Sequence, residues 1–280
     1  GRKIVGLNSF NLDFGLDYIL NNHSRKYVFD DKLSKELILL LSPSVKRKIF
    51  GGNLNVGFKL NAMNNRGSTN SNYAIFPNVN YNYIFSENNL SAKIGVRGGL
   101  DKNSYYSLSQ RNPFILNALE TDGGSLNLVN TQTKYDFFIG IDSYLGAEIN
   151  SFLQFSYARV HNMPFFELDD NSTYSNKFLV IYDNVNHFSL NSEIDWAMNT
   201  NSKFSLKLDY HNYDLDSLID YAYKPTIISK LGFLYNIGDK IIPKIELVCF
   251  IDRSKVEDSG WSNSPVLNDI VDIDFALEYK

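Results

Sequence analysis

Two side chains of the types needed for nucleophilic catalysis stand two positions apart, at His187 and Ser189. A serine hydroxyl becomes a good nucleophile when a base such as histidine removes its proton, so the two groups must be within hydrogen-bond reach. Alternate residues of a strand share one face, so this pair would lie on the same polar face of one strand. No surrounding motif supports a hydrolase, and a solvated pair lining a pore is the simpler interpretation.

Other groups that could do chemistry do not form a recognisable site. Asp214, Asp216 and Asp220 are faintly similar to a calcium loop, but the glycine and the terminal glutamate of that motif are missing. The pair Asp169 and Asp170 is discounted in the same way. The sequence has no phosphate-binding glycine loop and no dinucleotide fingerprint, so we expect no metal and no cofactor.

The elements that would position such residues are clearest in the stretch FNLDFGLDY, residues 10–18. Its even positions are apolar or aromatic, whereas its odd positions are Asn11, Asp13, Gly15 and Asp17. Successive side chains of a strand point to opposite faces, so this alternation predicts a strand that meets two different solvents. A helix would spread the same residues around its whole surface.

The same alternation recurs along the whole chain. It is found in residues 53–62, 78–85, 90–97, 137–141, 153–157, 188–198, 204–211, 231–237, 245–251 and 271–279. Short segments at 86–89, 199–202 and 236–240 have hairpin chemistry. Longer polar connections are expected at roughly 99–132, 161–175, 211–224 and 252–268. Tight turns and long loops together indicate an up-and-down meander with two unequal ends.

Strand length favours a membrane protein. Several segments reach about 9 to 11 residues, the length of a tilted strand that crosses a bilayer, whereas soluble strands average about 5 to 6. Unpaired backbone groups are costly in lipid, so such strands must close into a barrel. We expect one all-β domain over residues 1–280, an antiparallel up-and-down transmembrane β-barrel of about 12 to 14 strands. A soluble β-sandwich or propeller is the alternative.

Composition excludes several other classes. The net charge is −4 with no basic stripe, so we expect no nucleic acid partner. The single cysteine, Cys249, excludes an intramolecular disulfide framework. The longest apolar run covers only residues 37–41, far short of the roughly 20 residues of a spanning helix.

In a barrel of this kind the apolar face contacts lipid and the polar face lines a wet lumen. Charges of both signs alternate on the polar face, which predicts cross-strand ion pairs. The residues expected to line the lumen are Asp13, Asp17, Lys59, Lys93, Arg97, Glu193, Asp195, Lys207, Asp209, Asp272, Asp274 and Glu278.

Several strand and turn phrases carry a resemblance to a known family. They cover residues 76–85, 104–116, 128–143, 155–167, 178–186, 221–241 and 272–279. In these phrases the chain resembles the TonB-dependent receptor-like outer-membrane barrels of Bacteroidota. The resemblance implies a bacterial outer-membrane location and, in true receptors, energy-coupled uptake through a plugged barrel.

The resemblance implies a non-enzymatic receptor or transport barrel, for uptake of an unidentified small molecule or peptide or for a surface assembly. Outer-membrane lipid and a periplasmic energy-coupling or surface partner would surround it. The chain departs from the family in showing no plug domain and too few strands for the roughly 22 of a transporter. We therefore expect a barrel fragment or a smaller relative; a passive channel and a hydrolase are the alternatives.

Four residues carry the ligand-binding prediction. Asn112 and Phe114, and also Phe165 and Phe166, are expected in long connections, where exposed aromatic side chains would meet a ligand or partner. The alternative is that these aromatic side chains pack over the mouth of the barrel as a lid.

Overall fold

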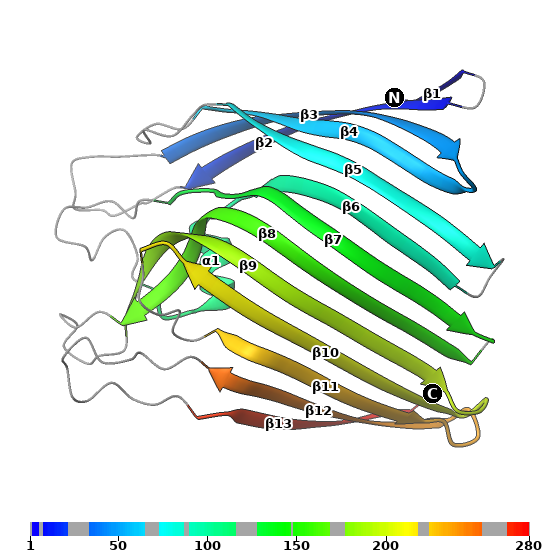
Figure 1. Ribbon diagram of the computed structural model, residues 1–280. Coiled ribbons are helices and arrows are strands. Elements are labelled where there is room, and N and C mark those ends of the chain that lie inside the picture. The colour runs from blue at the N-terminus through cyan, green and yellow to red at the C-terminus, as the bar shows by residue number, and fades with distance from the viewer. Residues whose placement is uncertain are drawn as a thin grey trace.

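The computed structural model describes residues 2–5, 8–21, 34–64, 73–86, 90–115, 128–146, 148–168, 177–217, 224–253 and 268–279. These residues form one thirteen-stranded sheet and a short helix, α1 (Tyr105–Arg111) (Figure 1). The strands are β1 (Arg2–Val5), β2 (Asn8–Asn21), β3 (Ser34–Ile49), β4 (Gly52–Asn64), β5 (Tyr73–Ser86), β6 (Leu90–Asp101), β7 (Thr131–Leu145), β8 (Ile149–Leu168), β9 (Phe178–Ala197), β10 (Ser202–Leu215), β11 (Pro225–Tyr235), β12 (Ile241–Arg253) and β13 (Ile270–Tyr279).

The strands follow one another in space in the order in which they occur in the chain. Each pairs with the next, from β1 to β13, and every pairing is antiparallel. The expected all-β, up-and-down architecture is thereby confirmed, with a strand number inside the expected range. The expectation of closure is not met by the described strands, because β1 and β13 are the two edges of a curved, open sheet (Figure 1).

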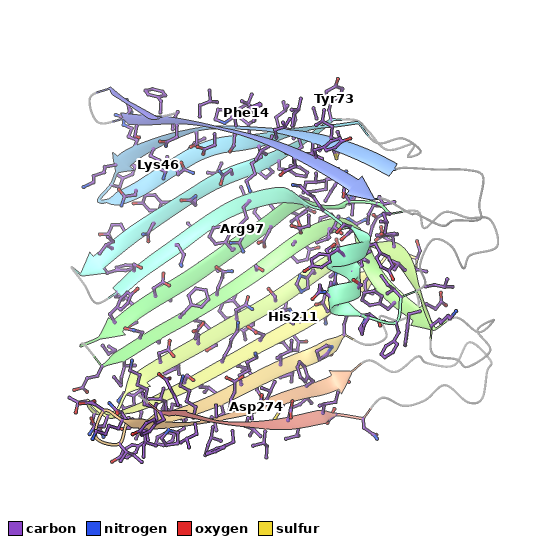
Figure 2. All side chains as sticks on the ribbon, turned by 180° about the vertical axis from the view of Figure 1, so that it is seen from behind. Phe14, Lys46, Tyr73, Arg97, His211 and Asp274 are labelled. Carbon is purple, nitrogen blue, oxygen red and sulfur yellow. The ribbon has the colours of Figure 1, made fainter. Side chains whose placement is uncertain are left out.

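The register keeps apolar side chains on one face of the sheet from β2 to β13. Phe14 of β2 stands opposite Leu41 of β3, which stands opposite Leu60 of β4. Near the other edge, Phe233 of β11 stands opposite Ile245 of β12, which stands opposite Phe275 of β13. Phe14 is 72% exposed and Phe275 is 67% exposed (Figure 2). An apolar surface of this extent is typical of a wall that faces lipid.

The opposite face of the sheet, called here the inner face, is mainly polar. Arg97 of β6 stands opposite Asn78 of β5 and Asp136 of β7 on this face. The sheet curves strongly around its inner face near the N-terminus, and this curvature brings Lys102, just after β6, into an ion pair with Asp17 of β2. Three strands separate these two partners in the sheet.

One part of the inner face departs from the expected wet surface. A buried cluster lies where β3 and β5 begin and β4 ends. It is formed by Ile38, Met63, Ala74 and Phe76, with Leu100 packed against it. Phe76 is fully buried. These apolar side chains belong to the inner-face phase, so the curved sheet packs against itself here instead of lining water.

The two ends of the sheet differ, as the sequence predicted. One end carries the short turns and the other the long connections (Figure 1). The β3–β4 turn has two residues, Phe50 and Gly51, with φ of 48° and 79°. Positive φ at both positions is the geometry of a type I′ hairpin, which matches the twist of the flanking strands.

The long-loop end contains more secondary structure than the sequence suggested. Strand β8 continues to Leu168, so the expected connection at 161–175 is wrong over its first part. The connection expected at 99–132 contains α1, which begins after the N-cap Ser104, whose hydroxyl accepts a hydrogen bond from the Ser107 amide. No helix among the described residues is long and apolar enough to span a membrane.

Candidate functional site at the long-loop end

Strands β8 and β9 extend beyond the rest of the sheet at the long-loop end. Pairing between β9 and β10 ends at Val185 and Leu215, whereas β8 and β9 continue to pair as far as Leu168 and Phe178. This extension, residues 163–168 and 178–183, is called here the β8–β9 arm. A bulge between Val160 and Met163 marks its base.

The bulge is fastened on both sides by hydrogen bonds. Asn162 adopts a φ of 54°, a conformation that asparagine tolerates better than most residues. Its amide N–H donates to Asn184 Oδ1 at 3.2 Å, and its carbonyl oxygen accepts from Thr131 Oγ1 at 2.8 Å. These two hydrogen bonds connect the base of the arm to β9 on one side and to the start of β7 on the other.

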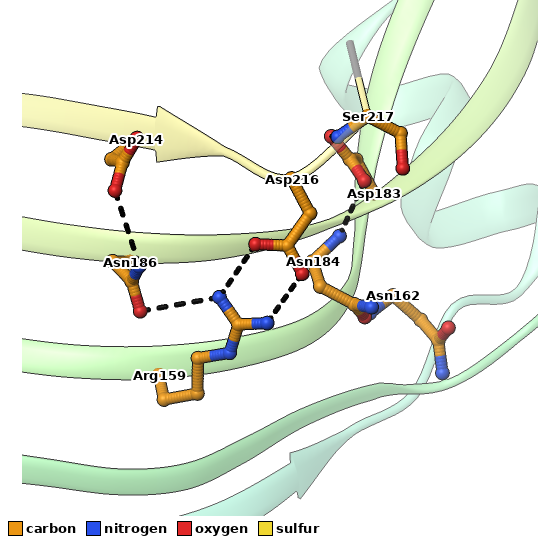
Figure 3. Close-up of polar contacts among 8 residues, drawn as sticks. All are labelled: Arg159, Asn162, Asp183, Asn184, Asn186, Asp214, Asp216 and Ser217. Atoms are coloured by element: carbon orange, nitrogen blue, oxygen red, sulfur yellow. Dashed lines mark hydrogen bonds and ion pairs between the residues drawn. The ribbon is translucent and has the colours of Figure 1, made fainter.

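A polar network joins β8 and β9 to the residues that follow β10 (Figure 3). Arg159 donates from Nη1 to Asp216 Oδ1 at 2.9 Å and to Asn186 Oδ1 at 3.2 Å, and its Nη2 contacts the other oxygen of Asp216. Nearby, Asp183 Oδ2 accepts from the Ser217 amide at 2.9 Å. The hydrogen bond from Arg159 holds the pKa of the Asp216 carboxyl below its usual range.

Arg159 and its partners lie just beyond the aromatic rim of the apolar face. Tyr157 is two positions earlier on the same phase of β8, and Phe188 and Tyr210 on β9 and β10 are in edge-to-face contact. Aromatic residues of this kind mark the boundary between lipid and water in outer-membrane barrels. The Arg159 network therefore begins where the outer surface becomes polar.

A buried lysine connects the start of β11 to the arm. Lys224 places its Nζ 4.2 Å from the ring centre of Phe165 on β8 and 5.1 Å from that of Tyr213 on β10. Its Nζ is buried and makes no hydrogen bond to any residue in the described part of the chain. Burial, with a smaller contribution from Arg111, lowers the pKa of Lys224 to about 7. The rings attract the ammonium form, but the loss of water around it has the larger effect on the pKa.

The loop containing α1 packs on the arm from another direction. The Phe178 amide donates to the Phe114 carbonyl at 3.0 Å, and the Val129 amide donates to Tyr182 Oη at 3.3 Å. The guanidinium of Arg111 lies 5.8 Å from the ring centre of Phe166. The loop that contains α1 and both ends of the β10–β11 connection thus meet at the β8–β9 arm.

The four residues of the ligand-binding prediction lie on or near this arm. The expected structural context of two of them is wrong. Asn112 caps the C-terminus of α1, and Phe114 is 59% exposed. Phe165 and Phe166 lie on β8, so their placement in a connection is wrong. Phe165 is only 2% exposed, because Lys224 and the arm cover it. A role in ligand binding stays a prediction for all four.

The residues expected to line a lumen lie on the inner-face phase, and several form ion pairs. Lys93 contacts Asp142 at 2.9 Å and Arg97 contacts Asp136 at 2.8 Å. The other pairs among them join Asp17 to Lys102, Lys207 to Asp209, and Glu278 to Lys244. The remaining members are Asp13, Lys59, Glu193, Asp195, Asp272 and Asp274. That this face surrounds a lumen stays a prediction.

The structure does not join His187 to Ser189 as a nucleophile and its base. His187 Nε2 is 3.1 Å from His211 Nδ1, and its ring stacks on Tyr213 with 4.5 Å between ring centres. Ser189 instead shares a hydrogen bond of 2.8 Å with Ser156 on β8. Each member of the pair is therefore engaged with a neighbouring strand.

The contacts of Asp214 and Asp216 do not support a calcium loop. Asp214 accepts from Asn186 Nδ2 at 3.2 Å and Asp216 is held by Arg159, so both carboxylates have protein partners. Asp169, Asp170 and Asp220 lie outside the described residues. Within the described part of the chain, no group of three or more His, Cys, Asp or Glu side chains is arranged to hold a metal ion.

Comparison with known proteins gives a fold but no sequence family. No family model matches the sequence, and no curated protein is similar to it at the level of sequence. Among solved structures, the copper transporter OprC matches 99% of this chain with a TM-score of 0.62 and 10% identity. The FrpB iron transporter from Neisseria meningitidis matches 99% with a TM-score of 0.65 and 9% identity. The described sheet has the fold of part of the barrel of these outer-membrane proteins.

A third structure extends this likeness to a receptor with its ligand. The pyoverdine outer-membrane receptor FpvA from Pseudomonas aeruginosa, bound to pyoverdine, matches 97% of this chain with a TM-score of 0.56 and 13% identity. The chain spans 42% of FpvA and 46% of OprC and FrpB, so it corresponds to less than half of each. These structures are TonB-dependent receptors and transporters, which confirms the fold that the sequence resemblance implied. A Bacteroidota origin is not shown.

The network at Arg159 and the buried Lys224 were missed by sequence reasoning. Arg159 breaks the apolar phase of its strand directly after Tyr157, a signal that the lipid-facing stretch ends there. The partners Asp216 and Lys224 lie in the connection after β10, and no local pattern reveals that they return to β8. Only the pairing of β8, β9 and β10 brings them together.

Proposed function

We propose that this chain forms part of the wall of an outer-membrane receptor or transport barrel and that it contributes to uptake of an external ligand. The observation that carries the proposal is the register of the sheet. From β2 to β13 one face stays mainly apolar and exposed while the other carries paired charges. A bilayer outside and water inside is the environment that matches both faces.

The two unequal ends support an orientation. Outer-membrane barrels place short turns in the periplasm and longer loops outside the cell. The end that carries the β8–β9 arm and α1 would then face the exterior. Phe114, Phe165 and Phe166, with Asn112, gather there, so this is the end at which we place ligand capture.

The likeness to receptors and transporters supports the same role without identifying the ligand. The matched proteins are described as handling copper, iron and pyoverdine, and one structure holds FpvAI together with pyocin S2. The proposed partners of this chain are outer-membrane lipid, a small-molecule or peptide ligand, and a periplasmic energy-coupling or surface partner. The proposed role is non-enzymatic.

The first experiment is to fold the purified chain in lauryldimethylamine oxide and compare its gel mobility before and after boiling. A compact band that shifts on boiling, together with recovery of the expressed chain in the outer-membrane fraction, is the expected result. A chain that stays soluble without detergent and has one mobility would overturn the proposal. Conductance across a planar bilayer then separates a passive channel from a receptor wall that needs further parts.

A further inference from the structure

Five asparagine side chains form a compact block on the inner face of β4 and β5. Asn53 stands opposite Asn82, Asn55 opposite Asn80, and Asn78 is next along β5 on the same face. Asparagine is depleted in strands because its side chain competes for backbone hydrogen bonds. Five on one face of a strand pair need an explanation other than strand stability.

Two amide oxygens of this block have no hydrogen-bond donor among the residues that the structure describes. Asn55 is only 8% exposed, and its Oδ1 is one of these two buried acceptors. Asn82 Oδ1 is in the same state. A buried acceptor without a donor destabilises the folded chain, so a ligand that supplies two donors to this block would gain binding energy.

Small residues and one aromatic ring border the block. Gly57 stands opposite Asn78, and Gly95 of β6 stands opposite Asn80, so neither position carries a side chain over the amides. A Cβ at Gly95 would lie 2.8 Å from Phe138 Cζ, which shows that the Phe138 ring lies against this glycine. The block is therefore a surface of five amides, two of whose oxygens are buried, and the Phe138 ring at its margin has the Arg97 guanidinium 4.9 Å from its centre.

The charges beside the block on β6 are already neutralised. Lys93 stands opposite Asn82 and is paired with Asp142, while Arg97 stands opposite Asn78 and is paired with Asp136. On the other side, Lys46 and Lys48 of β3 stand opposite Asn55 and Asn53. The block itself offers only neutral donors and acceptors, whereas the exposed Lys46 and Lys48 flank it on β3.

We infer that this block, Asn53, Asn55, Asn78, Asn80 and Asn82 with Phe138, is a binding surface for a hydroxyl-rich ligand of the carbohydrate class. Each amide offers one acceptor oxygen and an NH₂ donor, and each sugar hydroxyl offers the reverse set. The terminal torsion of asparagine is soft, so the buried oxygens turn toward a ligand hydroxyl at little cost. The C–H face of a sugar ring packs on an aromatic side chain such as Phe138. The inference rests on the proposed function, because it requires the inner face to border a solute path.

The test uses the chain folded in lauryldimethylamine oxide, whose head group contains no sugar, with maltotriose as probe and saturation-transfer NMR as readout. The variant Asn55→Ala/Asn82→Ala removes the two unsatisfied oxygens. Asn150→Ala removes an exposed asparagine of the same face on β8, opposite Asp195 and outside the block, and is the matched control. The double variant is expected to bind maltotriose about tenfold more weakly, and the control like the parent chain.

A second readout separates binding from a structural role. Because Asn55 and Asn82 have unmet acceptors, their removal is expected to leave the thermal midpoint of the folded chain unchanged or raised. Absence of a maltotriose signal, equal affinity in the double variant, or binding of a Gly-Ser peptide but not of the sugar would each overturn the inference. Binding of trigalacturonate but not of maltotriose would assign the surface to acidic sugars through Lys46 and Lys48 and overturn the neutral form. If the chain is heat-modifiable but binds no sugar, only the sugar-binding inference is overturned. If the chain does not fold in detergent, the proposed function itself is overturned.

Discussion

Arg159 of β8 and Asp216, which follows β10, face each other across the intervening strand β9 and are held together through both oxygens of the carboxylate. A guanidinium fork that meets a carboxylate in this way fixes orientation as well as distance. Asn186 of β9 accepts a hydrogen bond from the same Arg159, so three strands are tied at the boundary of the apolar face.

The first prediction concerns this contact. Replacing Arg159 by Gln removes the fork and frees the segment after β10. We expect hydrogen exchange at the amides of Asp216 and Ser217, which donate to Asn184 and Asp183, to become about tenfold faster. Lys203→Gln, at an exposed position of β10, is the control and should leave both rates unchanged. Equal rates in the Arg159 variant would show that the contact does not hold the segment.

The second prediction is an acid dependence of the same contact. Because Arg159 lowers the pKa of Asp216, the ionised carboxylate stabilises the folded segment at pH values above the ordinary aspartate range of about 3.9. This stabilisation is lost as the pH falls through the lowered pKa. A carboxyl carbon NMR titration should give an Asp216 midpoint below the ordinary range, returning to it in Arg159→Gln. An unchanged midpoint in that variant would assign the shift to another cause.

The third prediction concerns Lys224. Its pKa is about 7 in the folded protein and about 10.4 in an unfolded chain, so unfolding of its surroundings takes up a proton between these values. The packing of Lys224 on Phe165 should therefore be most stable above about pH 10 and weaken as the pH falls toward 7, with little further change below. Exchange rates of arm amides, corrected for intrinsic pH dependence, measure this. Lys224→Met should abolish the trend, and a trend that persists would point to another group.

The fourth prediction tests the two faces of one strand. Leu206 lies on the outer face of β10 and Ser205 on the inner face. Arginine in place of Leu206 should destabilise the folded chain in phospholipid vesicles by about 2–4 kcal/mol, because it meets hydrocarbon. Arginine in place of Ser205 should cost much less, since it meets water. Urea titration compares the two, and equal costs would remove the assignment of lipid to the apolar face.

The fifth prediction uses two glycines of β6. A Cβ at Gly95 would lie 2.4 Å from the Val79 carbonyl oxygen and 2.8 Å from Phe138, whereas at Gly99 only Lys59 Nζ lies nearby, at 3.8 Å. Gly95→Ala should destabilise by about 1–3 kcal/mol through overpacking, and Gly99→Ala should be close to neutral. The same urea titration measures both. A neutral Gly95→Ala would mean that β5 and β7 move apart easily.

Much of the fold could be predicted because alternation is a local property. Residues 10–18 reveal their two faces without knowledge of any partner, and antiparallel pairing by short turns then sets neighbours in order. Strand β3 was not predicted from alternation because residues 37–41 are all apolar. Ile38 on the inner face joins the buried cluster with Phe76, so both faces of that stretch are apolar.

The loop-end site was largely beyond local reasoning. The bulge at Asn162 lets β8 continue as a paired strand through a sequence, NMPFF, that reads as a connection. Phe165 is covered by Lys224, which is 59 positions away in the sequence. The two residues come into contact only when β8, β9, β10 and β11 pair. Contacts of this separation are set by tertiary structure and have no signature in a short window.

The open sheet has a consequence for how its edges are matched. With antiparallel neighbours throughout, the odd-numbered strands β1 and β13 run in the same direction. A second copy in the same orientation in the membrane would therefore meet either edge with a parallel strand. Antiparallel closure between β13 and β1 requires an odd number of additional strands, the first and last of which run opposite to β13 and β1. Any strands that complete the proposed wall must therefore be odd in number.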